Sequence, residues 1–389
     1  MNAMLEKGVK ILTRLQDHGY QAYFVGGAVR DFLLKRPIQD VDITTDAEPY
    51  QIEALFEKTI QTGAAFGTIT VLIEKTPYEV TTYRKETKYD NHRHPSELTF
   101  TKSLEEDLSR RDFTINQLVM DKDGRIYDYY NGKAALSQHV IETIGNPVER
   151  FEEDALRMMR AFRFKAQLNF TIAKATLAAI KENHQLLNQI AIERIQDELF
   201  KLLDAPYTKA VIADMTKTKV LSALSLTQAF ACLKTLDKPY GALEAFTVFY
   251  IHNTLELEQF RLSNKHIKTM KDTKQLHEAT AQDSFKPKHI FDFGSSACLF
   301  ANRINVLLGY ADQQSLIETL NQNLTLHKRS DLAINGKDLL QALNIDYKPH
   351  IAMILEALIH KVLDRDIPNQ KSPLINEAKK IHQTLKASE

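Results

Sequence analysis

The sequence predicts an α/β N-terminal head followed by an all-α neck, body and tail, on three observations. Short runs of β-forming residues are confined to roughly the first 140 residues. Glycine, proline and other turn residues separate those runs, and helical patterns lie between them. From about Phe151 onward the helical period dominates almost without interruption. A small mixed domain followed by helices is therefore expected.

Each expected element follows from a local pattern. Strands are expected at Ala22–Val25, Val41–Thr44, Thr68–Ile73, Tyr78–Tyr83 and Ile126–Tyr129, and head helices at Met4–His18, Ala28–Leu34 and Tyr50–Lys58. Later helices are expected at Phe151–Lys165, Ala173–Glu182, Ala191–Leu203 and Ile351–Leu363. Breaks near 146–147, 204–206 and 286–287 divide the chain into a head (1–146), a neck (147–205), a body (206–286) and a tail (287–389).

Composition excludes several classes of protein. The 389 residues carry 50 Lys and Arg against 50 Asp and Glu, so a nucleic-acid partner would need basic patches rather than an overall positive charge. The two cysteines, Cys232 and Cys298, form no metal-binding pattern and indicate a reducing compartment. No signal peptide and no apolar run of about 20 residues is evident. We expect a cytoplasmic protein with no membrane partner.

Two aspartates form the first candidate site. Asp40 and Asp42 flank Val41 in a segment of strand character, so both carboxylates point to the same face. Such a pair repels itself unless a cation lies between the two groups. Mg²⁺ suits these hard oxygen ligands and leaves positions for substrate phosphates, and a two-metal site can activate an attacking 3′-hydroxyl. Two solvated acids at a strand end are the alternative.

Neighbouring segments add to this pattern. Upstream, Gly26 and Gly27 lie between a strand and a helix, where a backbone can approach a phosphate, and Arg30 can add a positive charge. An ordinary tight turn is the alternative. Downstream, Glu79 can lie beside the aspartate strand as a third catalytic carboxylate. A surface glutamate on an edge strand is the alternative.

The segment Gly26-Gly27-x-x-Arg30-Asp31 followed by Asp40-Val41-Asp42 resembles the signature of the polymerase-β-like nucleotidyltransferases. More narrowly, it resembles the class II tRNA nucleotidyltransferases, or CCA-adding enzymes, and the related bacterial poly(A) polymerases. The resemblance is strongest over about 20–168 and extends more weakly through the helical part. It implies template-independent addition of CCA to the 3′ end of tRNA from CTP and ATP, with pyrophosphate released and Mg²⁺ as the cofactor.

A second segment, 110–116, is expected to open a helix with Asp112 and Asn116 on one face. The resemblance implies that Gly27, Arg30 and Arg111 hold the triphosphate and that Asp112 and Asn116 hold the ribose. An exposed helical turn is the alternative.

The third segment, 153–164, resembles the family's base-reading motif, and a salt-bridged helix face is the alternative. A carboxylate only accepts hydrogen bonds and a guanidinium only donates them. Asp154 can therefore accept from the amino group of cytosine or adenine while Arg157 donates to the adjacent ring nitrogen. Guanine and uracil would mismatch both groups, at about 1–3 kcal/mol each. Arg160 and Arg163 are expected to contact phosphate or tRNA.

Two further segments bear on the activity. The polar stretch 84–95 is expected to be a mobile loop, and its histidines, His92 and His94, to be solvated. It resembles the flexible loop that CCA-adding and A-adding enzymes carry and that enzymes adding only CC lack. Full CCA addition and A-only addition therefore both stay open. The segment 332–340 resembles a tail motif that binds the outer corner of tRNA. A poly(A) polymerase and a non-catalytic RNA-binding protein built on this fold also stay open, as does a homodimer.

Overall fold

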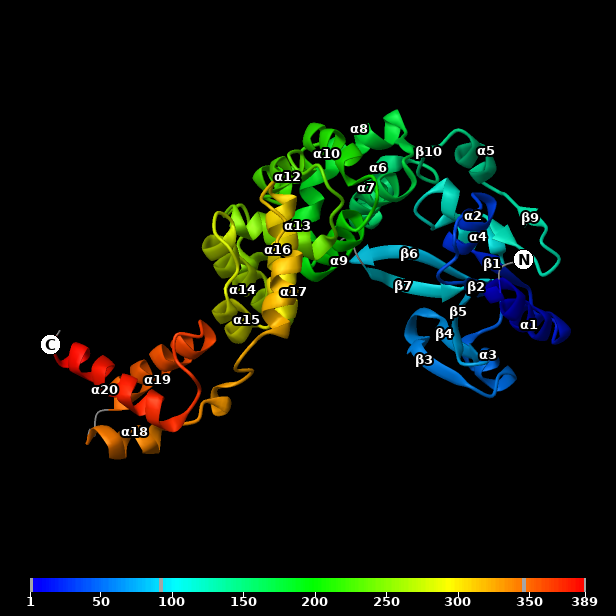
Figure 1. Ribbon diagram of the computed structural model, residues 1–389. Helices are drawn as coiled ribbons and strands as arrows, with labels where there is room; N and C mark the ends of the chain where they lie inside the picture. The colour runs from blue at the N-terminus through cyan, green and yellow to red at the C-terminus, as the bar shows by residue number, and fades with distance from the viewer. Residues whose placement is uncertain (1–2, 91–93, 345–347, 388–389) are drawn as a thin grey trace. The chain divides into compact units, whose positions relative to one another are not determined.

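The structure is a computed structural model that describes residues 3–90, 94–344 and 348–387 (Figure 1). The chain divides into two units. The first comprises Met1–Lys234 with Gln259–Arg261, and the second comprises Thr235–Glu258 with Leu262–Glu389. Every candidate catalytic or nucleotide-binding residue lies in the first unit.

The first unit contains a seven-stranded sheet with the order β3–β4–β5–β2–β1–β8–β9. Strands β2 and β5 run parallel, whereas the other neighbouring pairs are antiparallel. The strands are β1 (Ala22–Val25), β2 (Asp42–Thr45), β3 (Thr59–Gly63), β4 (Thr68–Ile73), β5 (Thr76–Thr82), β8 (Val119–Met120) and β9 (Ile126–Tyr127).

Strand register determines which residues meet at one end of β2. Asp42, the first residue of β2, is opposite Val25 on β1 and opposite Glu79 on β5. Gly26 follows Val25 directly, so the glycine turn reaches the end of β2 that carries Asp42. Val25, Ile43 and Val80 anchor this part of the sheet because each is at most 1% exposed.

Helices complete the first unit, with α1 packed on β1 through a face that includes Leu5, Ile11 and Leu12. They are α1 (Ala3–Asp17), α2 (Gly27–Leu33), α3 (Pro49–Leu55), α4 (Leu104–Ser109), α5 (Gly132–Ser137), α6 (Pro147–Glu153), α7 (Leu156–Leu168), α8 (Lys174–Asn183), α9 (Ile192–Leu203), α10 (Ile212–Lys217), α11 (Val220–Ala223) and α12 (Thr227–Leu233). A parallel pair, β10 (Val140–Ile141) and β11 (Thr171–Ile172), joins the sequence before α6 to the sequence after α7.

The second unit is helical among its described residues. Its helices are α13 (Ala242–Ile251), α14 (Asn264–Thr280), α15 (Pro287–Phe293), α16 (Ser295–Leu307), α17 (Gln314–Gln322), α18 (Gly336–Leu343), α19 (Lys348–Leu363) and α20 (Lys371–Ala387). Two apolar clusters stabilise them, one around Leu276 and Cys298 and the other around Leu339 and Leu358. The fold class predicted from the sequence, an α/β head and a helical remainder, is confirmed.

Three local predictions are wrong. The stretch 84–95 is not an irregular loop: Arg84–Asp90 (β6) and His94–Phe100 (β7) pair as an antiparallel hairpin that lies apart from the main sheet (Figure 1). Residues 91–93, with His92, lie outside the described residues. The segment 110–116 opens no α-helix, since α4 ends at Ser109 and only a 3-10 turn, Thr114–Asn116, follows.

The third error concerns the helix expected at Phe151–Lys165. Two helices, α6 and α7, replace it, and Asp154 lies at the break with extended backbone angles (φ −139°, ψ 99°). Its Oδ1 accepts a hydrogen bond from the Leu156 N–H at 3.1 Å and so caps the start of α7. A short acidic side chain that binds nearby backbone N–H groups in this way competes with continuation of the helix.

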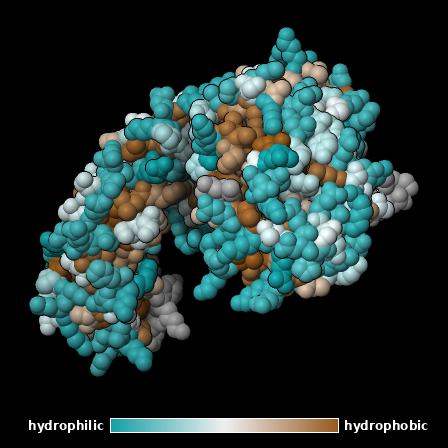
Figure 2. Space-filling view, turned by 90° about the vertical axis from the view of Figure 1, so that its right-hand side faces the viewer, coloured by the Kyte–Doolittle hydropathy of each residue, from teal (hydrophilic) through white to brown (hydrophobic). Residues whose placement is uncertain are grey.

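The surface seen in Figure 2 is mostly hydrophilic, with hydrophobic side chains emerging in smaller areas between the polar ones. Among the described residues, no helix combines the length and the apolar character that crossing a bilayer requires.

Candidate active site

A cleft of about 1040 Å³ in the first unit gathers eleven of the twelve predicted site residues. Ten Arg and Lys side chains and six Asp side chains line it, so the cleft is net positive although the whole chain is neutral. Such a charge distribution suits a polyanionic ligand. The predicted residues in the lining are Gly27, Arg30, Asp40, Asp42, Arg111, Asp112, Asn116, Asp154, Arg157, Arg160 and Arg163.

The two aspartates lie at the N-terminal end of β2. Asp40 is exposed on the segment before the strand, and Asp42 begins the strand itself. Burial and the charge of Asp40 raise the pKa of Asp42 to about 6, Arg111 lowers it, and Glu79 raises it. A cation between the two carboxylates would remove this repulsion.

The twelfth residue, Glu79, is opposite Asp42 in register but is exposed on β5 and does not line the cleft. Among the described residues, no three His, Cys, Asp or Glu side chains are grouped closely enough to hold a metal ion. The assignment of Asp40 and Asp42 as metal ligands stays a prediction, and a divalent ion there would take its further ligands from substrate phosphates and water.

The glycine turn has a backbone conformation that favours glycine. Gly26 adopts φ 73° and ψ −131°, a region that residues with a Cβ rarely enter. A Cβ atom added there would lie 3.8 Å from Asp42 Oδ2 and 3.7 Å from Arg111 Nη1. The backbone of the turn thus passes directly beside the aspartate and the arginine that the sequence assigns to metal and triphosphate.

Arg30 is almost completely buried in the cleft wall. Its Nε and Nη2 donate to both carboxylate oxygens of Asp31, at 3.0 and 2.9 Å, and its Nη1 donates to Asn116 Oδ1 at 2.7 Å. The guanidinium carbon lies 5.2 Å from the centre of the Phe164 ring. These contacts fix the positive charge in one orientation.

Asp112 and Asn116 are adjacent, as their spacing predicted, although no α-helix joins them. Asn116 Nδ2 donates to Asp112 Oδ1 at 3.1 Å, and Arg160 Nε donates to Asp112 Oδ2 at 2.8 Å. Burial alone would raise the pKa of Asp112, but Arg160 and the hydrogen bond from Asn116 lower it to about 2. Asp112 is therefore ionised throughout the physiological range.

Arg163 lies deeper than Arg160. Its Nη1 donates to Glu198 Oε1 on α9 at 3.0 Å, and its guanidinium carbon lies 4.5 Å from the centre of the Phe164 ring. Burial, together with the nearby charge of Arg160, lowers the pKa of Arg163 to about 10. Arg30, Arg160 and Arg163 thus surround the Phe164 ring, each within 5.4 Å of its centre.

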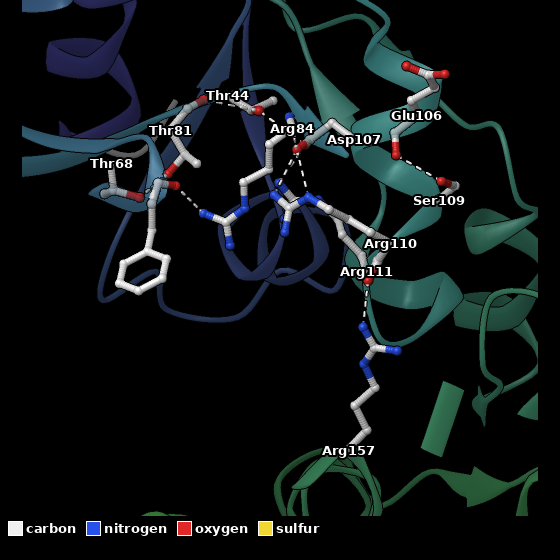
Figure 3. Close-up of polar contacts among 11 residues, drawn as sticks. Thr44, Thr68, Thr81, Arg84, Glu106, Asp107, Ser109, Arg110, Arg111 and Arg157 are labelled. Atoms are coloured by element: carbon white, nitrogen blue, oxygen red, sulfur yellow. Dashed lines mark hydrogen bonds and ion pairs between the residues drawn. The ribbon is translucent and has the colours of Figure 1, made fainter. Parts of the chain in front are cut away.

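Asp154 and Arg157 both line the cleft. They are not neighbours on one helix face, because the helical conformation is interrupted at Asp154. Asp154 Oδ2 faces Arg194 of α9 at 3.6 Å. The Arg157 guanidinium donates to Glu153 Oε2 at 2.8 Å and to the backbone oxygens of Arg150 and Arg110, at 3.0 and 2.8 Å. The contact with the Arg110 oxygen is visible in Figure 3.

Comparisons with known proteins agree with this geometry. Residues 22–142 match the family model of the poly A polymerase head domain, 169–229 match a probable RNA and SrmB binding site of polymerase A, and 245–378 match tRNA nucleotidyltransferase domain 2. The CCA-adding enzyme of Levilactobacillus brevis is 38% identical over 381 residues, which is 94% of this chain and 95% of that protein. The chain belongs to the family of CCA-adding enzymes.

Other CCA-adding enzymes support this membership. That of Anoxybacillus flavithermus is 38% identical over 385 residues and 96% of each chain. The crystal structure of the Bacillus stearothermophilus CCA-adding enzyme in complex with CTP has a TM-score of 0.91 and 30% identity, and covers 100% of each chain. The Thermotoga maritima enzyme complexed with tRNA, at 18% identity and a TM-score of 0.63 over 99% of this chain and 96% of that one, shares the fold. Membership of this nucleotidyltransferase family implies dependence on a divalent metal ion.

Several residues of the cleft were not identified from the sequence. Arg84, Arg110, Phe164 and Arg194 line the cleft, and the sequence offers no signal for Arg84, which is the first residue of β6. Arg194 and Glu198 lie on α9, in a segment predicted only as a neck helix of this family. Asp107 contacts Arg110 and Arg111, which follow it by three and four residues. This spacing is typical of an acid and an arginine that form an ion pair on a helix, so Asp107 could have been found from the sequence.

The tail motif of the family has a defined local structure. Asn335 caps α18, accepting hydrogen bonds from the Lys337 and Asp338 N–H groups at 2.8 and 3.3 Å. Leu339 is fully buried. A second pocket of about 500 Å³, in the second unit, is lined by Asn335, Gly336, Lys337, Leu340 and Ile351. Binding of the outer corner of tRNA by the segment 332–340 stays a prediction.

Proposed function

We propose that the cleft adds C, C and A in turn to the 3′ end of tRNA, using CTP, ATP and Mg²⁺ and releasing pyrophosphate. One observation carries this proposal: a single cleft contains the two aspartates, the buried arginines and the pair Asp154 and Arg157. The relatives support the choice of substrates, since solved structures of CCA-adding enzymes are described as complexes with CTP, ATP and tRNA.

The chemistry begins at the two aspartates. Asp40 and Asp42 would hold Mg²⁺ in a two-metal arrangement that activates the attacking 3′-hydroxyl and stabilises negative charge on the triphosphate. The 3′-hydroxyl loses its proton to solvent and its oxygen forms a bond to the α-phosphorus, while the bond from the α-phosphorus to the bridging oxygen of the β-phosphate breaks and pyrophosphate leaves. Glu79, which is opposite Asp42 in the sheet but outside the cleft lining, would contribute its negative charge beside Asp42.

Binding of the nucleotide follows from the fixed charges. We assign the triphosphate to the Gly27 backbone, Arg30 and Arg111, and the ribose to Asp112 and Asn116. Because Arg30 bonds Asn116 and Asn116 bonds Asp112, the phosphate and ribose groups of the site form one connected network. Arg160 also donates a hydrogen bond to Asp112, and Arg163 donates one to Glu198. Their role would be to orient Asp112 and to add positive charge.

Base selection needs groups that keep their orientation. Arg157 is held by two backbone oxygens and Glu153, and Asp154 is held by the Leu156 N–H and Arg194. A fixed acceptor beside a fixed donor fits the pairing edges of cytosine and adenine and opposes those of guanine and uracil. Two such mismatches would disfavour GTP and UTP by roughly 10²–10⁴.

The organisation of the chain fits the same function. We propose that residues 1–146 are the catalytic head, that 147–205 are the neck with the base-reading segment, and that 206–286 and 287–389 are a body and a tail that binds tRNA. Matches of the three family models to 22–142, 169–229 and 245–378 support this order. A cytoplasmic location follows from the proposed tRNA substrate.

The test is nucleotide incorporation by purified protein with Mg²⁺. Each labelled nucleoside triphosphate, and CTP with ATP together, is offered to tRNAs that end before CCA, after C and after CC. The proposal predicts CTP incorporation on the first two, ATP on the third, and a stop at CCA. Addition of ATP alone to the CC end would indicate an A-adding enzyme, and a long A tail on any RNA would indicate a poly(A) polymerase.

A further inference from the structure

One carboxylate beneath the cleft has no part in the proposed reaction. Asp107, on α4, is 0% exposed and does not line the cleft. Its Oδ1 accepts hydrogen bonds from Arg110 Nε and Nη2, at 3.0 and 2.7 Å, and its Oδ2 accepts one from Arg111 Nη2 at 3.3 Å. Both arginines line the cleft. Figure 3 shows the two guanidinium groups converging on this single carboxylate.

Two further donors come from the neighbouring strands. Thr44 Oγ1, on β2 two residues after Asp42, lies 3.3 Å from Asp107 Oδ2, and the backbone N–H of Arg84 lies 3.3 Å from Oδ1. Burial acts to raise the pKa of Asp107, but Arg110 and Arg111 outweigh it, so the net shift is downward and the group stays ionised. A buried charge with this many donors holds one orientation, and it transmits that orientation to its partners.

The arginines that Asp107 holds are close to the reaction. Arg111 Nη1 lies beside Gly26 and Asp42, since all three meet around the position where a Gly26 Cβ would be. The backbone oxygen of Arg110 accepts from Arg157 Nη2 at 2.8 Å. Asp107 cannot touch a ligand in the cleft itself, because it is fully buried. Any effect on substrate must therefore pass through the groups that Asp107 binds, of which Arg84, Arg110 and Arg111 line the cleft.

We propose that Asp107 is a positioning residue for the triphosphate: it directs the guanidinium groups of Arg110 and Arg111 into the cleft so that they meet the phosphates. The inference rests on the proposed function for nucleoside triphosphate binding. The inference adds Arg110 to the groups that contact phosphate. It also assigns Asp107 the role of orienting the two arginines.

Replacement of Asp107 by Asn tests the orientation of the two arginines while leaving the volume of the side chain at position 107 nearly unchanged. The amide has nearly the same shape, but it offers one acceptor oxygen and one NH₂ donor. Arg110 binds one oxygen of Asp107 and Arg111 binds the other. Whichever way the amide turns, its NH₂ group faces one of the two guanidinium groups and displaces it. The negative charge that offsets both arginines is lost as well.

The experiment measures dissociation constants of CTP, CDP and CMP, with Mg²⁺, for the wild type and Asp107→Asn. The control is Asp121→Asn, which removes a carboxylate from the same unit that accepts from Tyr127 and two backbone N–H groups outside the cleft. We expect CTP to bind about 10- to 100-fold more weakly to Asp107→Asn, CDP to lose less, and CMP and the control to change little. A triple variant, Asp107→Asn with Arg110→Gln and Arg111→Gln, should lose little beyond the double variant Arg110→Gln with Arg111→Gln, because Asp107 acts through these two arginines.

An equal loss for all three nucleotides would overturn the inference, because it would indicate general disorder rather than loss of phosphate contacts. Unchanged CTP affinity would overturn it too. If Asp107→Asn does not fold, Asp107→Glu retains the charge but shifts the carboxylate, and it should show the same dependence on phosphate number. Wild-type incorporation of CTP and ATP is measured in parallel: its absence would contradict the proposed function, whereas normal wild-type activity with an unaffected Asp107→Asn would contradict only this inference.

Discussion

Replacement of Asp154 by Asn tests how the base is selected. In the structure Asp154 Oδ1 accepts the Leu156 N–H at 3.1 Å, while Oδ2 faces the cleft residue Arg194 at 3.6 Å. In the variant only the amide oxygen can accept from that N–H group, so the NH₂ group must take the place of Oδ2. A donor then meets the amino group of cytosine or adenine where an acceptor was before.

The magnitude follows from one mismatched group. A buried donor set against a donor costs about 1–3 kcal/mol, which is roughly a 5- to 150-fold fall in kcat/KM for CTP and ATP. For UTP and GTP the new donor faces a carbonyl oxygen, so their kcat/KM should rise or hold. Arg157 still opposes their ring N–H, and neither becomes a good substrate. The ratio of kcat/KM for CTP to kcat/KM for UTP is therefore expected to fall at least about fivefold.

The assay is single-nucleotide incorporation, with each triphosphate titrated separately and Asp121→Asn as the control. CTP and UTP are offered to a tRNA that lacks CCA, and ATP and GTP to a tRNA that ends in CC. An unchanged ratio of CTP to UTP in Asp154→Asn would refute the assignment of Asp154 as the acceptor. A proportional fall for all four triphosphates would also refute it, because loss of the α7 cap would then explain the result without base reading.

Two further predictions concern stability. Gly26→Ala should lower the unfolding free energy of the first unit by about 1–3 kcal/mol, because residue 26 has a positive φ. Gly63→Ala, at φ −163°, should change it little and is the control. Denaturant unfolding measures both variants, and equal stability would contradict backbone strain at residue 26. The pKa of Asp112 lies near 2, below the ordinary value, so its stabilisation is fully present above about pH 4 and is lost as pH falls through 2. The difference in unfolding free energy between wild type and Asp112→Asn should therefore shrink by about 2 kcal/mol from pH 5 to pH 2, and a constant difference would contradict the Arg160 contact.

The parts of the fold that follow local rules could be predicted. Strands at Ala22–Val25 and Thr68–Ile73 have the bounds expected from their β-forming residues. The β6–β7 hairpin was missed because its sequence is polar and charged and resembles a loop. Within the part of the chain that the structure describes, its two strands pair with each other and with no strand of the seven-stranded sheet. Polarity therefore did not distinguish a two-stranded ribbon from an irregular segment.

The break at Asp154 was missed for a different reason. Apolar residues continue at helical spacing across it, and Phe151 and Met158 are both fully buried. Periodicity records which residues face the core, and two helices in succession can face the same core. The decisive interaction, the cap on the Leu156 N–H, is a side-chain choice that periodicity does not reveal.

The candidate site could be assembled largely from motifs, but its internal contacts could not. The motifs identified eleven residues that line the cleft, but they did not identify the partners that hold several of them, such as Asp107 and Glu198. The contact between Arg157 and the Arg110 oxygen joins residues 47 positions apart. The contact between Arg163 and Glu198 joins residues 35 positions apart. Such pairs depend on tertiary structure, and no local spacing in the sequence encodes them.

The most direct test of the account is Asp42→Ala. Nucleotide incorporation on a tRNA that lacks CCA is measured for wild type and variant, and tRNA affinity is measured for both by gel shift. The account predicts that the wild type completes CCA and that the variant transfers no nucleotide while binding tRNA nearly as tightly. Retained transfer by Asp42→Ala would contradict the assignment of this cleft as the catalytic centre.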